Sequence, residues 1–200
     1  MTFGDYVLLC RTADRPGKLA AISDAVRSHG GDVRDAQSFG DDATGAFFVR
    51  MQVRLADSRA DALRKNIAEI GDMLPGAACL HATAQRPRLV IAVSKFDHCL
   101  VDLLHRHRVG AIGGDIAAVI SNHDTTRPLV EWHDIPFIHL PVTQETKFEQ
   151  QAAFQRAVSD AGADLVVLAR YMQVLSNELC DAWAGKCINI HHSFLPSFKG

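Results

Sequence analysis

The sequence predicts an α/β protein of two domains, a β-α-β-β-α-β unit over residues 1–84 and a parallel-sheet unit over residues 85–200. The chain has 200 residues, of which 48% are apolar and 22% charged, enough to build a core in one or two domains. The apolar pattern changes near residue 85. Before it, short strands alternate with two helices; after it, uninterrupted apolar runs alternate with helical stripes.

The first domain begins with a β-rich run over residues 6–10, which the turn-forming Asp14, Pro16 and Gly17 follow. A helix over 18–29 comes next and ends at two glycines. The remaining elements are a strand over 33–39, a turn over 41–45, a strand over 46–53, a helix capped by Ser58 with the apolar stripe Leu63, Ile67, Ile70 and Leu74, and a strand over 78–83. This order is the ferredoxin-like, split βαβ arrangement.

A polar, proline-containing linker over residues 84–88 separates the domains. The second domain then alternates buried strands with helices, which predicts a Rossmann-like parallel sheet with right-handed crossovers. The expected strands are 89–93, 116–120, 137–140, 165–169 and 187–190, and the expected helices are centred on 100–104, 147–161 and 176–183.

Composition excludes several classes of protein. The net charge of −2 provides no basic face, so we expect neither nucleic acid nor a membrane surface as a partner. The start of the chain lacks the basic and apolar regions of a signal peptide, which favours the cytoplasm. Five cysteines without a Cys-x-x-Cys spacing fit free thiols better than disulfides or a metal site, and we expect no metal. A dinucleotide-binding Gly-x-Gly-x-x-Gly is missing after the first parallel strand.

Polar residues follow four of the strands predicted in the second domain. Ligands of open parallel sheets bind beyond the carboxyl ends of the strands, so these residues are candidates for one site. They lie at 94–98, 121–124, 170–173 and 189–196.

Asn189 and His191 form the sharpest of these patterns. They are two residues apart in a strand, so their side chains project to the same face. An Asn amide stabilises a developing oxyanion and a His transfers protons near neutral pH, which suits acyl chemistry. On spacing alone, a pair that only ends a strand with local hydrogen bonds fits equally well. Ser193 lacks the Gly-x-Ser-x-Gly context of a serine nucleophile.

Two motifs of the second domain resemble the folate-dependent formyltransferase family. They are Asn189-Ile190-His191-His192-Ser193-Phe194-Leu195-Pro196 and the upstream Ala169-Arg170-Tyr171-Met172-Gln173-Val174-Leu175-Ser176. Within the family, the double histidine, the Ser121-Asn122-His123 element and a small N-terminal domain are similar to the branch that hydrolyses formyltetrahydrofolate. The first domain resembles ACT domains, whose first loop typically reads Asp-x-Pro-Gly, as Asp14-Arg15-Pro16-Gly17 does here.

The resemblance implies roles for individual residues. Asn189 would polarise the formyl carbonyl, and His191 would stabilise the tetrahedral intermediate and help to protonate the departing folate nitrogen. The substrate-binding residues would be Met172, Gln173, Leu175 and Ser193, with the backbone of Gln173 and Leu175 reading the edge of the pterin. The tetrahydrofolate derivative is the substrate, and no separate cofactor is expected.

The loop over 94–98 favours water as the acceptor of the formyl group. The related glycinamide ribonucleotide formyltransferases cradle a substrate phosphate in a Gly-rich loop at this place, whereas this loop has no glycine and carries a carboxylate. Hydrolysis to formate and tetrahydrofolate, which supplies purine synthesis and balances one-carbon pools, is therefore the expected activity. The alternatives are formyl transfer to an amine such as glycinamide ribonucleotide and a non-catalytic, amino-acid-sensing ACT protein.

For the first domain, the resemblance implies a regulatory role. Asp14, Pro16 and Gly17 would bind an amino-acid effector such as glycine or methionine, at the free N–H groups of the following helix. The same residues also fit a plain turn and helix start. ACT-type units commonly associate, so we expect a homo-oligomer.

The chain ends at Gly200, directly after the Asn189–Pro196 motif. Members of the family continue with further strands and helices and with an acidic residue that orients the histidine. No residue of this sequence matches that acidic residue. We therefore expect the chain to be a truncated form that binds folate weakly and has little activity by itself.

Overall fold

The computed structural model describes residues 2–70 and 73–190, with the backbone alone over 73–77. The chain divides into two compact units, Met1–Gln85 and Arg86–Gly200, and each is described by itself.

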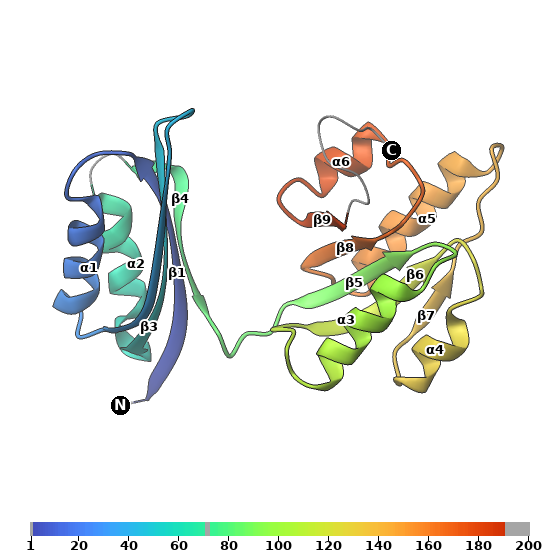
Figure 1. Cartoon of the computed structure of the whole chain (residues 1–200), viewed down its shortest axis with the longest axis horizontal. Helices are drawn as coiled ribbons and strands as arrows, with labels where there is room; N and C mark the ends of the chain where they lie inside the picture. Colours follow the sequence, from blue (N-terminus) through green and yellow to red (C-terminus); the bar gives the residue numbers. More distant parts are fainter. Residues whose placement is uncertain (1, 71–72, 191–200) are drawn as a thin grey trace. The chain divides into compact units, whose positions relative to one another are not determined.

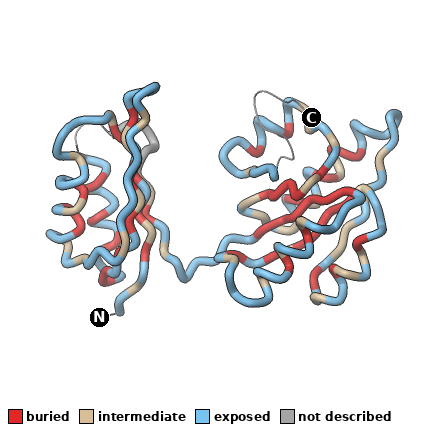
Figure 2. The backbone as a smooth tube through the Cα atoms, viewed as in Figure 1, coloured by how far each residue is buried: buried red, intermediate tan, exposed pale blue. Residues whose placement is uncertain are grey.

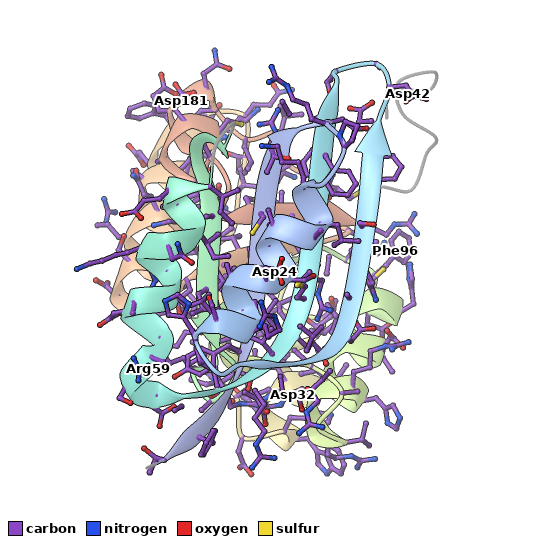
Figure 3. All side chains as sticks on the ribbon, turned by 90° about the vertical axis from the view of Figure 1, so that its left-hand side faces the viewer. Asp24, Asp32, Asp42, Arg59, Phe96 and Asp181 are labelled. Carbon is purple, nitrogen blue, oxygen red and sulfur yellow. The ribbon has the colours of Figure 1, made fainter. Side chains whose placement is uncertain are left out.

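The first unit is an antiparallel sheet with two helices on one face (Figures 1 and 3). The strands lie in the order β2-β3-β1-β4. The elements along the chain are β1 (Phe3–Ala13), α1 (Lys18–Ser28), β2 (Asp32–Asp41), β3 (Ala46–Ala56), a 3-10 turn (Asp57–Arg59), α2 (Ala60–Glu69) and β4 (Met73–Ala82). This is the β-α-β-β-α-β order that the sequence predicts.

The core of the first unit lies between the sheet and its helices. Every second residue over 6–12 of β1 and 49–55 of β3 is buried, and members of this set such as Leu8 and Met51 share one core with Ile22 of α1 and Leu63 of α2. Burial of each such side chain contributes about 1.5–3 kcal/mol. The residues between them on the same strands point to the other face.

The helix α2 differs from its prediction at both ends. Ser58 lies in the 3-10 turn, and Arg59 occupies the N-cap position without a side-chain cap, so the expected Ser58 cap is wrong. At the other end, Ile70 is extended and ends the helix, and Leu74 belongs to β4. A spacing of four residues keeps side chains on one face in a strand as well as in a helix. The predicted apolar stripe of the helix therefore extends to Leu74, beyond the observed end of α2.

The second unit is a parallel sheet with the strand order β7-β6-β5-β8-β9 (Figure 1). The sequence predicts this sheet and each of its strands. The short helix α4 is not predicted, because its six residues are too few to show a helical period and include Pro128, which is typical of a turn. The equally short α6 has the additional signal of its capping residue Ser176. The elements are β5 (Arg88–Val93), α3 (His98–Arg108), β6 (Asp115–Ser121), α4 (Arg127–Trp132), β7 (Phe137–His139), α5 (Lys147–Asp160), β8 (Leu165–Ala169), α6 (Asn177–Ala182) and β9 (Cys187–Ile190).

The central strand β5 is buried on both faces, as Figure 2 shows. Val90 belongs to the same core cluster as Phe154 of α5, and Ile91 to the cluster of Leu100 of α3. Along the chain, β6 and β7 follow on one side of β5, and β8 and β9 then lie on its other side. The carboxyl ends of β5 and β8 therefore form a topological switch point, where open α/β sheets bind their ligands.

Over the described ranges, no helix has both the length and the apolar character needed to cross a membrane.

Candidate functional site

A cavity of about 360 Å³ lies beyond the carboxyl ends of β8 and β9. Its lining includes Asn189 together with Met172, Gln173 and Leu175. The structure thus brings four of the predicted site residues into one hollow, although they come from two separate segments of the sequence. His191 and Ser193, the other two site residues predicted in the second domain, lie outside the described residues.

Asn189 is the third residue of β9 and pairs in register with Leu168 of β8. Its side chain is exposed and forms no hydrogen bond with another residue of the ranges 2–70 and 73–190. An amide in this position is available to donate to a ligand oxygen, which is the chemistry expected of an oxyanion-stabilising group.

The segment 172–176 is held by alternate backbone groups. The Met172 N–H donates to Ser94 Oγ at 3.0 Å, and Gln151 binds the next two alternate groups. Gln151 Nε2 donates to the Val174 carbonyl at 3.0 Å, and the Ser176 N–H donates to Gln151 Oε1 at 2.9 Å.

Gln173 and Leu175 lie between these anchored groups. Within the part of the chain that the structure describes, their backbone N–H and C=O groups form no hydrogen bond. Backbone donors and acceptors at the rim of a cavity are obligatory hydrogen-bonding groups. They can read the edge of a flat, polar heterocycle, which is the role expected for these two residues.

Two buried glutamines of α5 support the cavity wall, and the sequence reading missed them. Gln151 anchors the segment as described, and Gln150 Nε2 donates to the Tyr171 hydroxyl at 2.9 Å. Burial raises the pKa of the Tyr171 hydroxyl above its ordinary value. Gln150 lies four residues before the buried Phe154 on the same helix, so its place in the apolar stripe is a signal that could have identified it.

Ser94 joins three strand ends. It follows β5, is 3% exposed, and donates its hydroxyl to Asn122 Oδ1 beyond β6 at 2.7 Å while accepting from Met172 beyond β8. Three of the four polar clusters predicted to converge are therefore linked by one hydroxyl.

Comparison with known proteins identifies the family. Residues 87–200 match the family described as formyl transferase. The chain is 39% identical over 197 residues to a formyltetrahydrofolate deformylase from a Corynebacterium species, with 98% of this chain and 69% of that relative covered. A crystal structure of the formyltetrahydrofolate deformylase from Burkholderia mallei is 42% identical, with a TM-score of 0.84 over 98% of this chain and 70% of that one.

The chain belongs to the formyltetrahydrofolate deformylase family.

A more distant structural likeness covers little more than half of the chain. The phosphoribosylglycinamide formyltransferase from Brucella melitensis is 26% identical, with a TM-score of 0.53 over 58% of this chain and 62% of that one. The deformylases, by contrast, match the chain over both of its units.

Other residues singled out in the sequence lie away from the cavity. His123 is exposed and does not line the cavity. Its backbone N–H donates to Ser121 Oγ at 3.1 Å. Among the described residues, no group of three or more His, Cys, Asp and Glu side chains is placed to hold a metal ion.

Asp14, Pro16 and Gly17 lie in the exposed loop between β1 and α1 of the first unit. Gly17 has a φ of 86° and occupies the N-cap position of α1, a left-handed conformation that glycine adopts without strain. A hollow of about 570 Å³ in this unit is lined by other residues, among them Leu9, Phe39 and Phe48 on the sheet face away from the helices. The structure therefore does not place the predicted effector residues in that hollow.

Proposed function

We propose that this protein hydrolyses formyltetrahydrofolate to formate and tetrahydrofolate. The observation that carries the proposal is the cavity that Asn189 shares with the segment 172–175, in a chain of the deformylase family. The relatives are named for this reaction, and the cavity offers an amide donor and backbone hydrogen-bonding groups that suit it.

The pterin would lie against the segment 172–175. The unpaired backbone groups of Gln173 and Leu175 would bind the polar edge of the ring, and Met172, which is 52% exposed, would cover part of its face. Because Ser94 and Gln151 fix the alternate groups on either side, these donors and acceptors are oriented before the substrate arrives.

The formyl group would then lie beside Asn189. Attack by water converts the planar formyl carbon into a tetrahedral centre, and the carbonyl oxygen gains negative charge. The Asn189 amide would donate to this oxygen, an interaction that is stronger in the transition state than in the ground state. His191 would supply the proton that the folate nitrogen takes as the C–N bond breaks.

The loop after β5 supports water rather than an amine as the acceptor. Ser94 is buried and engaged at both its donor and its acceptor, and residues 95–97 contain no glycine that would let a backbone cradle approach a phosphate. A phosphorylated amine therefore gains little from this loop.

For the first unit, we propose an ACT-type regulatory role. The exposed loop with Asp14, Pro16 and Gly17, at the N-terminus of α1, would bind an amino acid such as glycine or methionine, and the unit would associate with a second copy. The formate released by the second unit would feed purine synthesis. Calorimetry of the protein with glycine and with methionine tests the effector; no heat at millimolar concentrations contradicts it.

The decisive experiment measures formate release from formyltetrahydrofolate, with and without an added primary amine, for this chain and for a chain extended to the length of its deformylase relatives. Release by the extended chain at the same rate in both reactions supports hydrolysis. Formylation of the amine without free formate assigns a transferase, and the absence of both products from the folded, monodisperse extended chain contradicts either activity. Comparable rates in the two chains would contradict the expectation that the 200-residue chain has little activity by itself.

A further inference from the structure

Arg170 follows β8 and has a φ of 58°, a left-handed conformation that is rare for residues other than glycine, asparagine and aspartate. It lines the cavity and immediately precedes the segment that we propose to bind the pterin. Its Nε atom is buried without a hydrogen-bond partner among the described residues. Backbone strain and an unsatisfied donor are both unfavourable, and such features concentrate where a binding site requires a particular geometry.

Two side chains hold this arginine, Phe96 in the turn after β5 and His98 at the start of α3. The Arg170 guanidinium carbon lies 4.9 Å from the centroid of the Phe96 ring, within the range of a cation–π contact. Arg170 Nη1 lies 3.3 Å from His98 Nε2. The rings of Phe96, labelled in Figure 3, and His98 also lie against each other, with centroids 6.5 Å apart. In the ranges that the structure describes, no carboxylate pairs with Arg170, so these two rings are its partners.

The same two turns meet a second time at Ser94. The Met172 N–H donates to Ser94 Oγ two residues after Arg170. The turn after β5 therefore holds the turn after β8 at a side chain and at a backbone group, on either side of Tyr171, which is itself buried. We refer to the contacts of Arg170 with Phe96 and His98 as the arginine clamp.

We propose that Arg170, held by the arginine clamp, is a positioning residue for substrate binding in this protein. The clamp fixes the start of the segment 172–175, so that the backbone groups of Gln173 and Leu175 face the cavity. This inference rests on the proposed function for its effect on substrate, but the clamp itself is observable without any reaction.

The test compares Phe96→Leu with Trp132→Leu. Trp132 is a matched control because it also forms an exposed cation–π contact, with Arg108 Cζ at 5.8 Å, but lies on α4 and does not line the cavity. Hydrogen exchange of the backbone amides over 170–176 reports the clamp directly. We expect faster exchange there in Phe96→Leu, unchanged exchange in Trp132→Leu, and a return to the wild-type rate in Phe96→Tyr, which keeps an aromatic face.

The effect of the clamp on substrate binding is measured by steady-state kinetics of the chain extended to the length of its deformylase relatives. Phe96→Leu should raise KM for formyltetrahydrofolate about three- to tenfold, the size expected for losing one partly exposed cation–π contact, with kcat nearly unchanged. Arg170→Gly should give a similar increase, because glycine accepts the left-handed backbone while removing the side chain. The double variant should be no worse than either single variant, because both remove the same contact.

The outcomes separate the two proposals. Unchanged exchange over 170–176 in Phe96→Leu overturns the clamp, and faster exchange with an unchanged KM overturns its role in positioning. Additive effects of the two substitutions overturn the coupling between Phe96 and Arg170. Absence of formate release by the wild-type chain extended to the length of its relatives contradicts the proposed function, and the exchange measurement then still decides whether the clamp exists.

Discussion

The antiparallel sheet of the first unit has helices on one face, whereas the parallel sheet of the second has them on both. In β1 this difference is visible in neighbouring residues, since Leu8 is 1% exposed and Leu9 is 41% exposed. In β5, the five residues from Leu89 to Val93 are all buried. A sheet covered on both faces can present groups to a ligand only at its strand ends, which is where the candidate site lies. A sheet covered on one face can present a whole surface.

The comparison predicts that removing an aromatic ring lowers the free energy of unfolding much more in the second unit than in the first. Phe154 is fully buried against the rings of Tyr171 and Trp183, with centroids 5.3 and 5.0 Å away. Phe154→Ala should reduce the free energy of unfolding of the second unit by about 3–5 kcal/mol. Phe39→Ala on the open face of the first unit, where Phe39 is 65% exposed, should cost less than about 1 kcal/mol. Urea denaturation measures both, and equal costs would contradict the difference between the two sheets.

A second prediction concerns the strand ends. Asn189→Ala should lower kcat by about 10²–10³, because one oxyanion donor stabilises the transition state by about 2.7–4 kcal/mol. KM and the thermal unfolding midpoint should change little, since the exposed Asn189 side chain has no hydrogen-bond partner among the residues described. Initial rates of formate release, measured in the chain extended to the length of its relatives, provide the test, with Asn177→Ala on the exposed start of α6 as a control. A variant with near-normal kcat would remove Asn189 from the chemistry.

The smallest expected effect compares a buried thiol of the first sheet with an exposed thiol of the second unit. Burial raises the pKa of Cys10, which faces the helices, to about 12. Because the folded-state pKa lies above the ordinary value, the neutral thiol is favoured, and the associated stability is lost as the pH rises from about 9 towards 12. Alkylation followed by mass spectrometry at pH 9 should therefore modify the exposed Cys180 well before Cys10. Equal rates would show that Cys10 is accessible.

Much of this architecture could be predicted because β5, β6 and β8 of the second unit each contain a continuous apolar run of five residues. The polar residues that follow these runs then identify the strand ends. The relation of Asn189 to the segment 172–175 was also predictable in outline, since parallel strands bring their carboxyl ends to one edge. The pattern of residues along the sequence does not show which polar groups form hydrogen bonds with one another.

Ser94, Gln151 and Arg170 illustrate that limit. Each acts through a partner at least 20 residues away in sequence, and their residue types are ordinary for a turn or a helix. The positive φ of Arg170 is equally invisible, because glycine is the residue that normally signals a left-handed turn. Leu74 shows the opposite problem, a spacing compatible with two structures, so that the pattern alone selected the wrong one.

The alternating anchorage of residues 172–176 has a consequence for inhibitor resistance. A compound that binds through the unpaired backbone groups of Gln173 and Leu175 depends on atoms that every amino acid except proline possesses. Side-chain replacement at these two positions leaves those atoms in place. Escape from such a compound would therefore involve changes at Ser94 or Gln151, which anchor the segment, and if the segment binds the pterin as proposed, these changes would weaken substrate binding as well.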